Sequence, residues 1–189
     1  MKEIKPAVVM FLLLTVICGG IYPAVVTGIA QGVFPKQADG SLIFDQNGKT
    51  IGSALIGQPI SDPKYFWPRP SASAGFAYNP LASGGSNAGP TNADYLATVE
   101  ERVKVLRDSG ITGPIPAELV QASASGLDPH LSPAGVLLQV PRVAKVRGMA
   151  ESRLAAIIAA HTEDRQLGFL GDSRVNVLVL NVELDRLQP

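Results

Sequence analysis

Ala7–Phe34, AVVMFLLLTVICGGIYPAVVTGIAQGVF, decides how this chain of 189 residues is organised, because the stretch carries no formal charge. A helix of this length rises about 42 Å at 1.5 Å per residue, which exceeds the roughly 30 Å hydrocarbon core of a bilayer. The sequence therefore predicts one membrane-spanning helix. We expect residues 1–34 to form a cytoplasmic tip and this anchor, and residues 35–189 to form a single extracytoplasmic domain.

The charges that flank the span predict its orientation. Lys2 and Lys5, with Glu3 between them, precede the span, whereas the first basic residue after it is Lys36, soon followed by Asp39. Short segments with excess positive charge usually stay in the cytoplasm. We therefore expect a single-pass protein of the cell inner membrane, surrounded by lipid at its span, with a cytoplasmic N-terminus and a periplasmic C-terminal domain.

Two other interpretations of this N-terminus stay open. A cleaved signal peptide would end near the small residues Gly28 and Ala30, and a lipoprotein signal would end at Cys18. The uncharged run is longer than a usual signal-peptide core, and Ile17 is not the small residue that a lipoprotein signal needs before its cysteine. These two observations favour the anchor.

Small residues recur every four positions within the span, at Gly20, Ala24, Gly28 and Gly32. Such spacing lines one face of a helix and allows a second helix to approach closely. We therefore predict that this face contacts the membrane helices of a partner. The alternative is that small residues are simply common in membrane helices. Pro23, beside this row, is predicted to kink the span.

The composition after the span limits the classes of function. Residues 36–189 are enough for one domain with its own core. With Lys2, Lys5 and Glu3 set aside, they hold 14 basic and 15 acidic residues. A domain with this nearly neutral composition lacks the basic surface that nucleic-acid binding requires, so we expect no nucleic-acid partner. Cys18 is the only cysteine, which excludes an internal disulfide and a cysteine-based metal site.

Several patterns place the domain in the α+β class. Asn47–Gly48, between SLIFDQ and KTIGSALIG, predicts a β-hairpin. Residues 55–92, rich in Pro, Gly, Ser and Asn, predict a long loop region that points to function or an interface. Arg174–Glu183 is apolar on both faces and predicts a central, doubly buried strand. Helical patterns cover four stretches: 93–109, 117–123, 134–147 with an interruption at Pro141, and 151–161.

The first of these helices has both a start signal and an apolar stripe. Thr91 or Asn92 is expected to cap its N-terminus, and Gly110 to end it. The stripe that we predict to be buried consists of Tyr95, Leu96, Val99, Val103 and Leu106.

The sequence offers no recognisable active site. Neither of the usual glycine-rich nucleotide fingerprints occurs. His130 is expected to order its loop and His161 to lie at a helix C-terminus, and neither has the spacing of a metal ligand. Ser61 and Lys64 match S-x-x-K of certain serine hydrolases, but the partner motifs are missing. We expect no catalytic residue, no metal and no cofactor bound by the chain alone; a membrane-anchored periplasmic hydrolase is the remote alternative.

Five long motifs after the span occur in the order of a known family. They are YFWPRPSA (65–72), YNPLASGGSN (78–87), GPTN (89–92), SGLDPH (125–130) and LGFLG with RVNV (167–171 and 174–177). Together with the span, they resemble the C subunit of the bacterial potassium-transporting P-type ATPase, the Kdp system. The resemblance runs from the membrane helix to the last predicted strand.

This resemblance implies an accessory, non-catalytic subunit of an ATP-driven potassium uptake complex. The implied partners are a channel-like potassium-binding subunit, a P-type ATPase subunit and a small membrane peptide. The implied role is assembly together with a catalytic-chaperone effect, in which ATP binds more tightly to the ATPase subunit in a transient complex. The alternative is a purely structural or ion-access element over the outer mouth of the channel-like subunit.

The resemblance also implies candidate residues. Leu55, Gly57 and Gln58 match a family stretch that is similar to the ABC-transporter signature, which implies an association with nucleotide. The predicted topology places these residues away from cytoplasmic ATP, and the alternative is that they end a hairpin strand. Candidates for the subunit interface lie in the predicted loop region, although aromatic clusters are more often core: Tyr65, Phe66, Trp67, Arg69, Asn79, Ser86 and Asn87.

Overall fold

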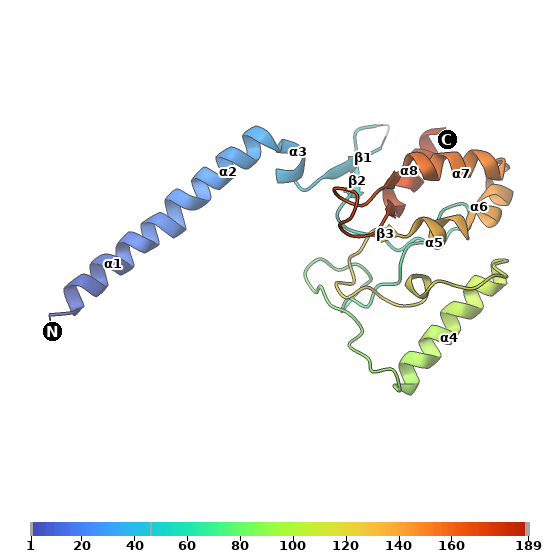
Figure 1. The fold of residues 1–189 in the computed structure, drawn as a ribbon, viewed down its shortest axis with the longest axis horizontal. Coiled ribbons are helices and arrows are strands. Elements are labelled where there is room, and N and C mark those ends of the chain that lie inside the picture. Colours follow the sequence, from blue (N-terminus) through green and yellow to red (C-terminus); the bar gives the residue numbers. More distant parts are fainter. Residues whose placement is uncertain (1, 46, 188–189) are drawn as a thin grey trace. The chain divides into compact units, whose positions relative to one another are not determined.

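The protein is described by a computed structural model that covers residues 2–45 and 47–187. The chain divides into two compact units, Met1–Leu42 and Ile43–Pro189 (Figure 1). An N-terminal apolar helix precedes a mixture of helices and small sheets, which confirms the predicted α+β class. Three predicted boundaries lie outside the described residues. They are the start of the first predicted domain at residue 1, the end of the second at residue 189, and the end of the first hairpin strand at Gln46.

The first unit is dominated by one helix that runs from Ile4 to Val33 and is long and apolar enough to cross a membrane. It consists of α1 (Ile4–Val16), a π-helical turn η1 (Ile17–Ile21) and α2 (Tyr22–Val33). Pro23 has no N–H to donate to the preceding turn, and the π turn lies directly before it. A π turn therefore lies just before Pro23, and the kink that the sequence predicts there stays a prediction.

A short helix connects the anchor to the rest of the chain. This helix, α3 (Pro35–Ala38), follows Phe34 at once. The amide of Gln31 donates to Asp39 across this junction at 3.2 Å. The helix α3 belongs to the same compact unit as the span.

The part of the chain that the structure describes contains two small sheets. The hairpin predicted around Asn47–Gly48 is confirmed, with β1 (Leu42–Phe44) beside β2 (Thr50–Ser53). The other sheet has β5 (Arg174–Asn176) at its centre, between β3 (His130–Leu131) and β4 (Thr162–Glu163). Because these strands are two or three residues long, sheet pairing alone cannot hold the domain together.

The helices of the domain begin where the sequence supplies caps. Asn92 accepts the N–H of Tyr95 at the start of α4 (Ala93–Asp108), and Ser132 accepts that of Gly135 at the start of α5. The remaining helical elements are the 3-10 turn η2 (Ala117–Leu119), α5 (Pro133–Leu137), α6 (Val140–Arg147), α7 (Glu151–Ala160) and α8 (Val177–Leu187). Figure 1 shows α5, α6, α7 and α8 gathered around the three-stranded sheet, with α4 at the other end of the domain.

The predicted strand over 174–183 is wrong beyond Asn176, where the chain turns into α8 (Val177–Leu187). The side chain of Asn176 accepts the N–H of Val179 and so caps the helix. The buried positions Val177, Leu180, Asn181 and Leu184 follow the helical period. Over ten residues, an apolar run of this kind fits both the two-residue period of a strand and the 3.6-residue period of a helix. The cap at Asn176 and the later leucines favour the helix.

Two helical details also differ from the predictions. In α4 only Leu106 of the predicted stripe is fully buried, and Leu96 is half exposed, because few elements pack against this helix. The helix predicted over 117–123 is reduced to the single 3-10 turn of η2.

The core cluster joins residues of α4–α8, the three-stranded sheet and the connections between them, and it includes Phe66 of the predicted loop region. Phe66 has no exposed surface and belongs to the same cluster as the helix residues Leu154, Leu180 and Leu184. The predicted loop is therefore part of the hydrophobic core and not only a surface connection.

Candidate functional site

The connection between β2 and α4 is the largest irregular feature of the domain. Residues 54–92 are all described and contain no helix or strand, as predicted. We call this segment the long loop. Since buried backbone groups must find partners, the segment needs side chains from elsewhere to hold it.

Two buried amides supply those partners in the first half of the long loop. Asn181 of α8 accepts the N–H of Phe66 and donates to its carbonyl, both at 2.9 Å. Gln139 accepts the N–H of Trp67 at 2.8 Å and donates to its carbonyl at 3.1 Å. We call these four bonds the amide clasp. Each amide does for its residue what a neighbouring strand does in a sheet, because it pairs one N–H and one C=O.

Arg142 of α6 secures the segment just before the clasp. Its Nη1 donates to the carbonyls of Pro63 (2.6 Å) and Tyr65 (3.0 Å), and its Nη2 donates to Gln139 (2.7 Å). The guanidinium also lies over the Trp67 ring, 3.9 Å from its centre. Burial lowers the pKa of Arg142 to about 10, so the side chain stays protonated at neutral pH.

A second arginine fixes Tyr65 against α8. Arg147 donates to Asp185 at 2.7 Å and to the carbonyl of Lys64 at 2.7 Å. The Tyr65 hydroxyl donates to the same carboxylate at 2.7 Å. Burial, helped by the hydrogen bond to Asp185, raises the pKa of Tyr65.

The second half of the long loop locks into the segment 123–128. Ser71 donates to the carbonyl of Gly126 at 2.7 Å and accepts the N–H of Tyr78 at 2.9 Å. The Tyr78 hydroxyl donates to the carbonyl of Arg69, and burial together with the charge of Asp128 raises the pKa of Tyr78. Gly126 has φ +69°, and a Cβ there would lie 2.7 Å from a carbonyl oxygen of the long loop, so only glycine fits.

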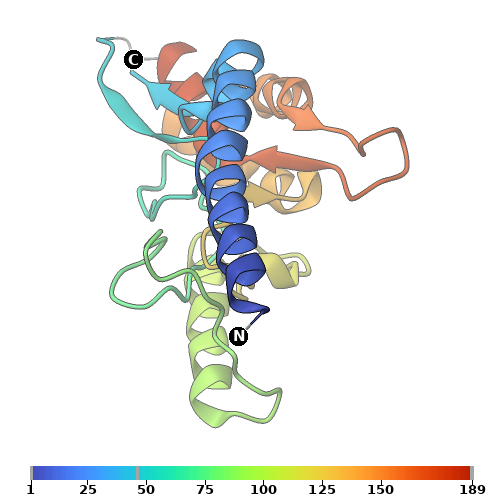
Figure 2. The same cartoon turned by 90° about the vertical axis from the view of Figure 1, so that its left-hand side faces the viewer.

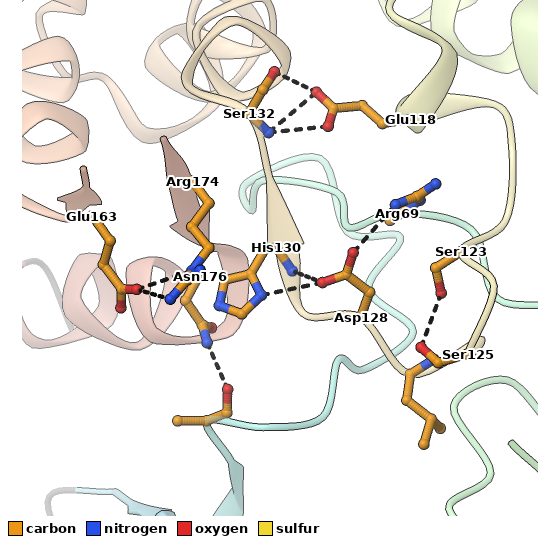
Figure 3. A network of polar contacts seen from close by, with 12 residues as sticks. Arg69, Glu118, Ser123, Ser125, Asp128, His130, Ser132, Glu163, Arg174 and Asn176 are labelled. Atoms are coloured by element: carbon orange, nitrogen blue, oxygen red, sulfur yellow. Dashed lines mark hydrogen bonds and ion pairs between the residues drawn. The ribbon is translucent and has the colours of Figure 1, made fainter. Parts of the chain in front are cut away.

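Asp128 joins the two segments electrostatically. It accepts from Arg69 at 3.2 Å, and from both the backbone N–H (3.0 Å) and the ring Nδ1 (3.1 Å) of His130, as Figure 3 shows. Burial opposes ionisation of this carboxyl, but the contacts with His130 and Arg69 outweigh it, so the pKa of Asp128 lies below its ordinary value. His130 thus orders its loop, as the sequence predicts.

The motif segments 65–72, 78–87 and 125–130, far apart in the sequence, therefore lie against one another. We call their combined surface the loop face. The described residues contain no group of three or more His, Cys, Asp and Glu side chains that could hold a metal ion. The chemistry that this face offers is hydrogen bonding and shape from prearranged polar loops.

The residues implied to associate with nucleotide are largely committed to the fold. Leu55 is exposed, in the turn that follows β2. Gly57 is buried, donates its N–H to Leu127 at 2.9 Å, and leaves no room for a Cβ beside the ring of Tyr78. The amide of Gln58 donates to the carbonyl of Ile51 at 2.6 Å.

The predicted interface residues fall into three groups. Phe66 is a core residue and cannot belong to a surface, which corrects that part of the prediction. Tyr65, Trp67, Arg69 and Asn79 are half-buried in the loop face, and Ser86 and Asn87 are exposed. Two of the three groups are therefore available to a partner.

The predicted small-residue face of the span is open. Ala24, Gly28 and Gly32 all belong to α2 and keep the spacing of four, whereas Gly20 lies in the π turn. A Cβ at Gly20, Gly28 or Gly32 would meet nothing within 4 Å.

A groove of about 590 Å³ borders the loop face between the long loop and α4. Trp67 and Tyr78 line it from the loop, and Arg102 and Leu106 line it from the helix. Arg102 is held there by a 2.8 Å bond to the carbonyl of Val120.

The residues that sequence reasoning missed are those that hold the loop. Gln139 and Arg142 lie within a predicted helical stretch and Asn181 within the predicted strand, and nothing local assigns them partners about 70 to 120 residues away. A usable signal exists in Asn181, because a polar side chain within an apolar run that is buried must find a buried partner.

We predict that Asp128→Asn destabilises the full chain by about 1–3 kcal/mol at pH 7, because the bonds to Arg69 and His130 lose their charge. Since the native pKa of Asp128 is lowered, its stabilisation is complete above about pH 4 and is lost as the pH falls through that native pKa. Thermal unfolding in detergent should therefore show a gap between wild type and variant that closes in acid. Asp172→Asn, at an exposed ion pair, is the control. A gap that is independent of pH contradicts this assignment.

Comparison with known proteins gives a consistent result over the full chain. The sequence profile of the family described as "KdpC: K+-transporting ATPase, c chain" matches residues 4–186. A protein of Geobacter sulfurreducens named "Potassium-transporting ATPase KdpC subunit" is 68% identical over 189 residues, which is 100% of each chain. Proteins of the same name from Geobacter metallireducens and Methylococcus capsulatus are 66% and 52% identical, covering 100% and 99% of each chain.

The family match includes both the span and the loop face, and it agrees with the resemblance inferred from the motifs. Such a family places the chain in the multi-subunit potassium-transporting ATPase complex. The chain belongs to the KdpC family, the c chains of the K+-transporting ATPase.

Proposed function

We propose that this chain is a non-catalytic subunit that joins a channel-like potassium-binding subunit, a P-type ATPase subunit and a small membrane peptide into one complex. The observation that carries this proposal is the loop face, which is prearranged by the amide clasp and by the bonds of Ser71 and Asp128. Loops that are already ordered lose little conformational entropy on docking, so they suit a stable protein contact.

We further propose that the chain raises the affinity of the ATPase subunit for ATP indirectly. Gly57 and Gln58 already use their backbone or amide groups inside the domain, which leaves little for a nucleotide. A subunit that binds more tightly to the ATPase conformation with the higher affinity for ATP shifts the enzyme toward that conformation, and by linkage it raises the apparent affinity for ATP. This catalytic-chaperone effect needs no contact between this chain and ATP.

The span supplies the second attachment to the complex. We propose that Ala24, Gly28 and Gly32 of α2 pack against a membrane helix of a partner, since their open surface permits close approach.

We propose a periplasmic loop face, on the basis of Lys2 and Lys5 before the span. In a Cys18→Ala background, Ser86→Cys should react with a membrane-impermeant thiol reagent in intact cells, because Ser86 is exposed on the loop face. The control is a Glu3→Cys variant, which keeps both lysines before the span and should react only after the cells are opened. If only the Glu3→Cys variant is labelled in intact cells, the topology is the reverse of the proposed one and direct contact with ATP becomes an explanation again.

The main test is the potassium-stimulated ATPase activity of the purified complex over a range of ATP concentrations. We compare the wild-type chain, omission of the chain, and Ala24→Leu with Gly28→Leu. Val26→Leu with Ala30→Leu is the matched control, since it has the same spacing on the other side of α2. We expect omission to dissociate the complex or to raise the ATP concentration at half-maximal activity. The Ala24/Gly28 pair should lower co-purification several-fold and the control pair should not.

Two results would contradict the proposal. If the complex stays intact without the chain and its activity depends on ATP as before, both the assembly role and the effect on ATP affinity are contradicted. If the two double variants co-purify equally well with the partners, the small-residue face is not a contact. This result would not contradict the proposal for the loop face.

A further inference from the structure

The loop between β4 and β5 exposes a cluster of three large apolar side chains, and the proposed function makes no use of them. Leu167, Phe169 and Leu170 expose 83%, 69% and 48% of their surface. We call these three residues the apolar tip. Figure 2 shows the loop, in orange-red, projecting from the domain beyond the two strands.

The apolar tip is held in place by its own backbone. Gln166 and Leu170 exchange two backbone hydrogen bonds, both of 2.9 Å, and Gly168 donates to Arg165 at 3.0 Å. Leu167 has φ +54°, a conformation that leucine adopts rarely and keeps only where the surroundings determine it. The loop therefore displays its apolar side chains in one defined arrangement.

The charged side chains at the base of this loop are two arginines and three carboxylates, and each arginine pairs with one carboxylate. Arg165 pairs with Asp172 at 2.9 Å, and Arg174 of β5 pairs with Glu163 of β4 at 2.8 Å. The remaining carboxylate, Asp164, accepts from Ser173 at 3.3 Å. Residues 166–171 carry no formal charge, so the tip can leave water without taking a charge with it.

The composition of the tip favours lipid over a protein surface. Residues 167–171 are Leu-Gly-Phe-Leu-Gly and have no side-chain donor or acceptor. Protein interfaces usually combine apolar anchors with polar or charged groups that fix the partner. A cluster of Phe and Leu without such groups suits the boundary between lipid headgroups and acyl chains.

The anchor brings the domain to such a boundary. The span ends at Val33 and β1 begins at Leu42. The chain between them reaches at most about 30 Å when fully extended. A domain of this size has a radius of gyration of about 15 Å, so the tether keeps it near the bilayer. An exposed apolar tip thus meets lipid at high effective concentration.

We propose that the apolar tip inserts into the interfacial region of the leaflet that faces the domain. It forms a second, shallow lipid contact that restrains how the domain turns about its tether. The proposal needs the anchor but not the assembly or ATP roles, so it can fail or hold independently of them.

Fluorescence quenching by brominated lipid tests the proposal. The full chain with Cys18→Ala and Phe169→Cys is labelled with bimane and reconstituted into phosphatidylcholine vesicles with or without brominated acyl chains. The matched control carries the label at Lys104→Cys, on the exposed side of α4. We expect quenching to be several-fold stronger, and the emission to be shifted to the blue, for the label in the tip.

A second labelled variant separates the effect of the tip from that of the label itself. The label is placed at Leu170→Cys in a chain that also carries Leu167→Ser and Phe169→Ser, and its quenching should fall to that of the control. Equal quenching for Phe169→Cys and Lys104→Cys overturns the proposal. A blue shift that appears only with the partner subunits, without quenching by brominated lipid, also overturns it and assigns the tip to a protein contact.

Discussion

The amide clasp is the interaction on which the rest of the domain depends. Asn181 and Gln139 together satisfy both backbone groups of Phe66 and of Trp67 at a point where no strand is available. A typical hydrogen bond of this kind contributes about 0.5–1.5 kcal/mol net, but leaving one of its buried groups unpaired costs about 1–3 kcal/mol. The clasp thus acts chiefly through the cost of breaking it, because any other course of the loop would leave these buried groups unpaired.

This constraint links the core to the functional surface. With its backbone paired, the chain can place Phe66 in the core while Trp67 and Tyr65 stay at the surface beside Arg142 and Arg147. From there the loop continues to its contacts with the segment around Gly126 and Asp128. The loop face can therefore be stiff without regular secondary structure, which is the property that docking to a partner in a multi-subunit complex requires.

The sequence predicts the local features of this protein well. The span, the turn at Asn47–Gly48, the cap at Asn92 and the long loop follow from composition, periodicity and turn chemistry over short stretches. The apolar run after Arg174 is ambiguous because its alternation holds for only ten residues, and the cap at Asn176 decides it. The family motifs also locate the loop face, although not its internal contacts.

Sequence reasoning cannot predict the contacts between distant segments. Gln139 and Asn181 are 72 and 115 residues from their partners, and their side chains are consistent with a solvent contact as well as with a clasp. The same limit explains Phe66, which reads as a surface candidate within a polar loop until its place in the core is known.

Hydrogen exchange of the Phe66 and Trp67 amides tests the central claim most directly. In the full chain in detergent, these two amides should exchange as slowly as those in the middle of α7, although they lie in a segment without helix or strand. Asn181→Leu should accelerate the Phe66 amide by about 5-fold to 150-fold, which corresponds to the loss of about 1–3 kcal/mol. Exchange of both amides at the rate of an unprotected loop, with no response to that substitution, would contradict the account.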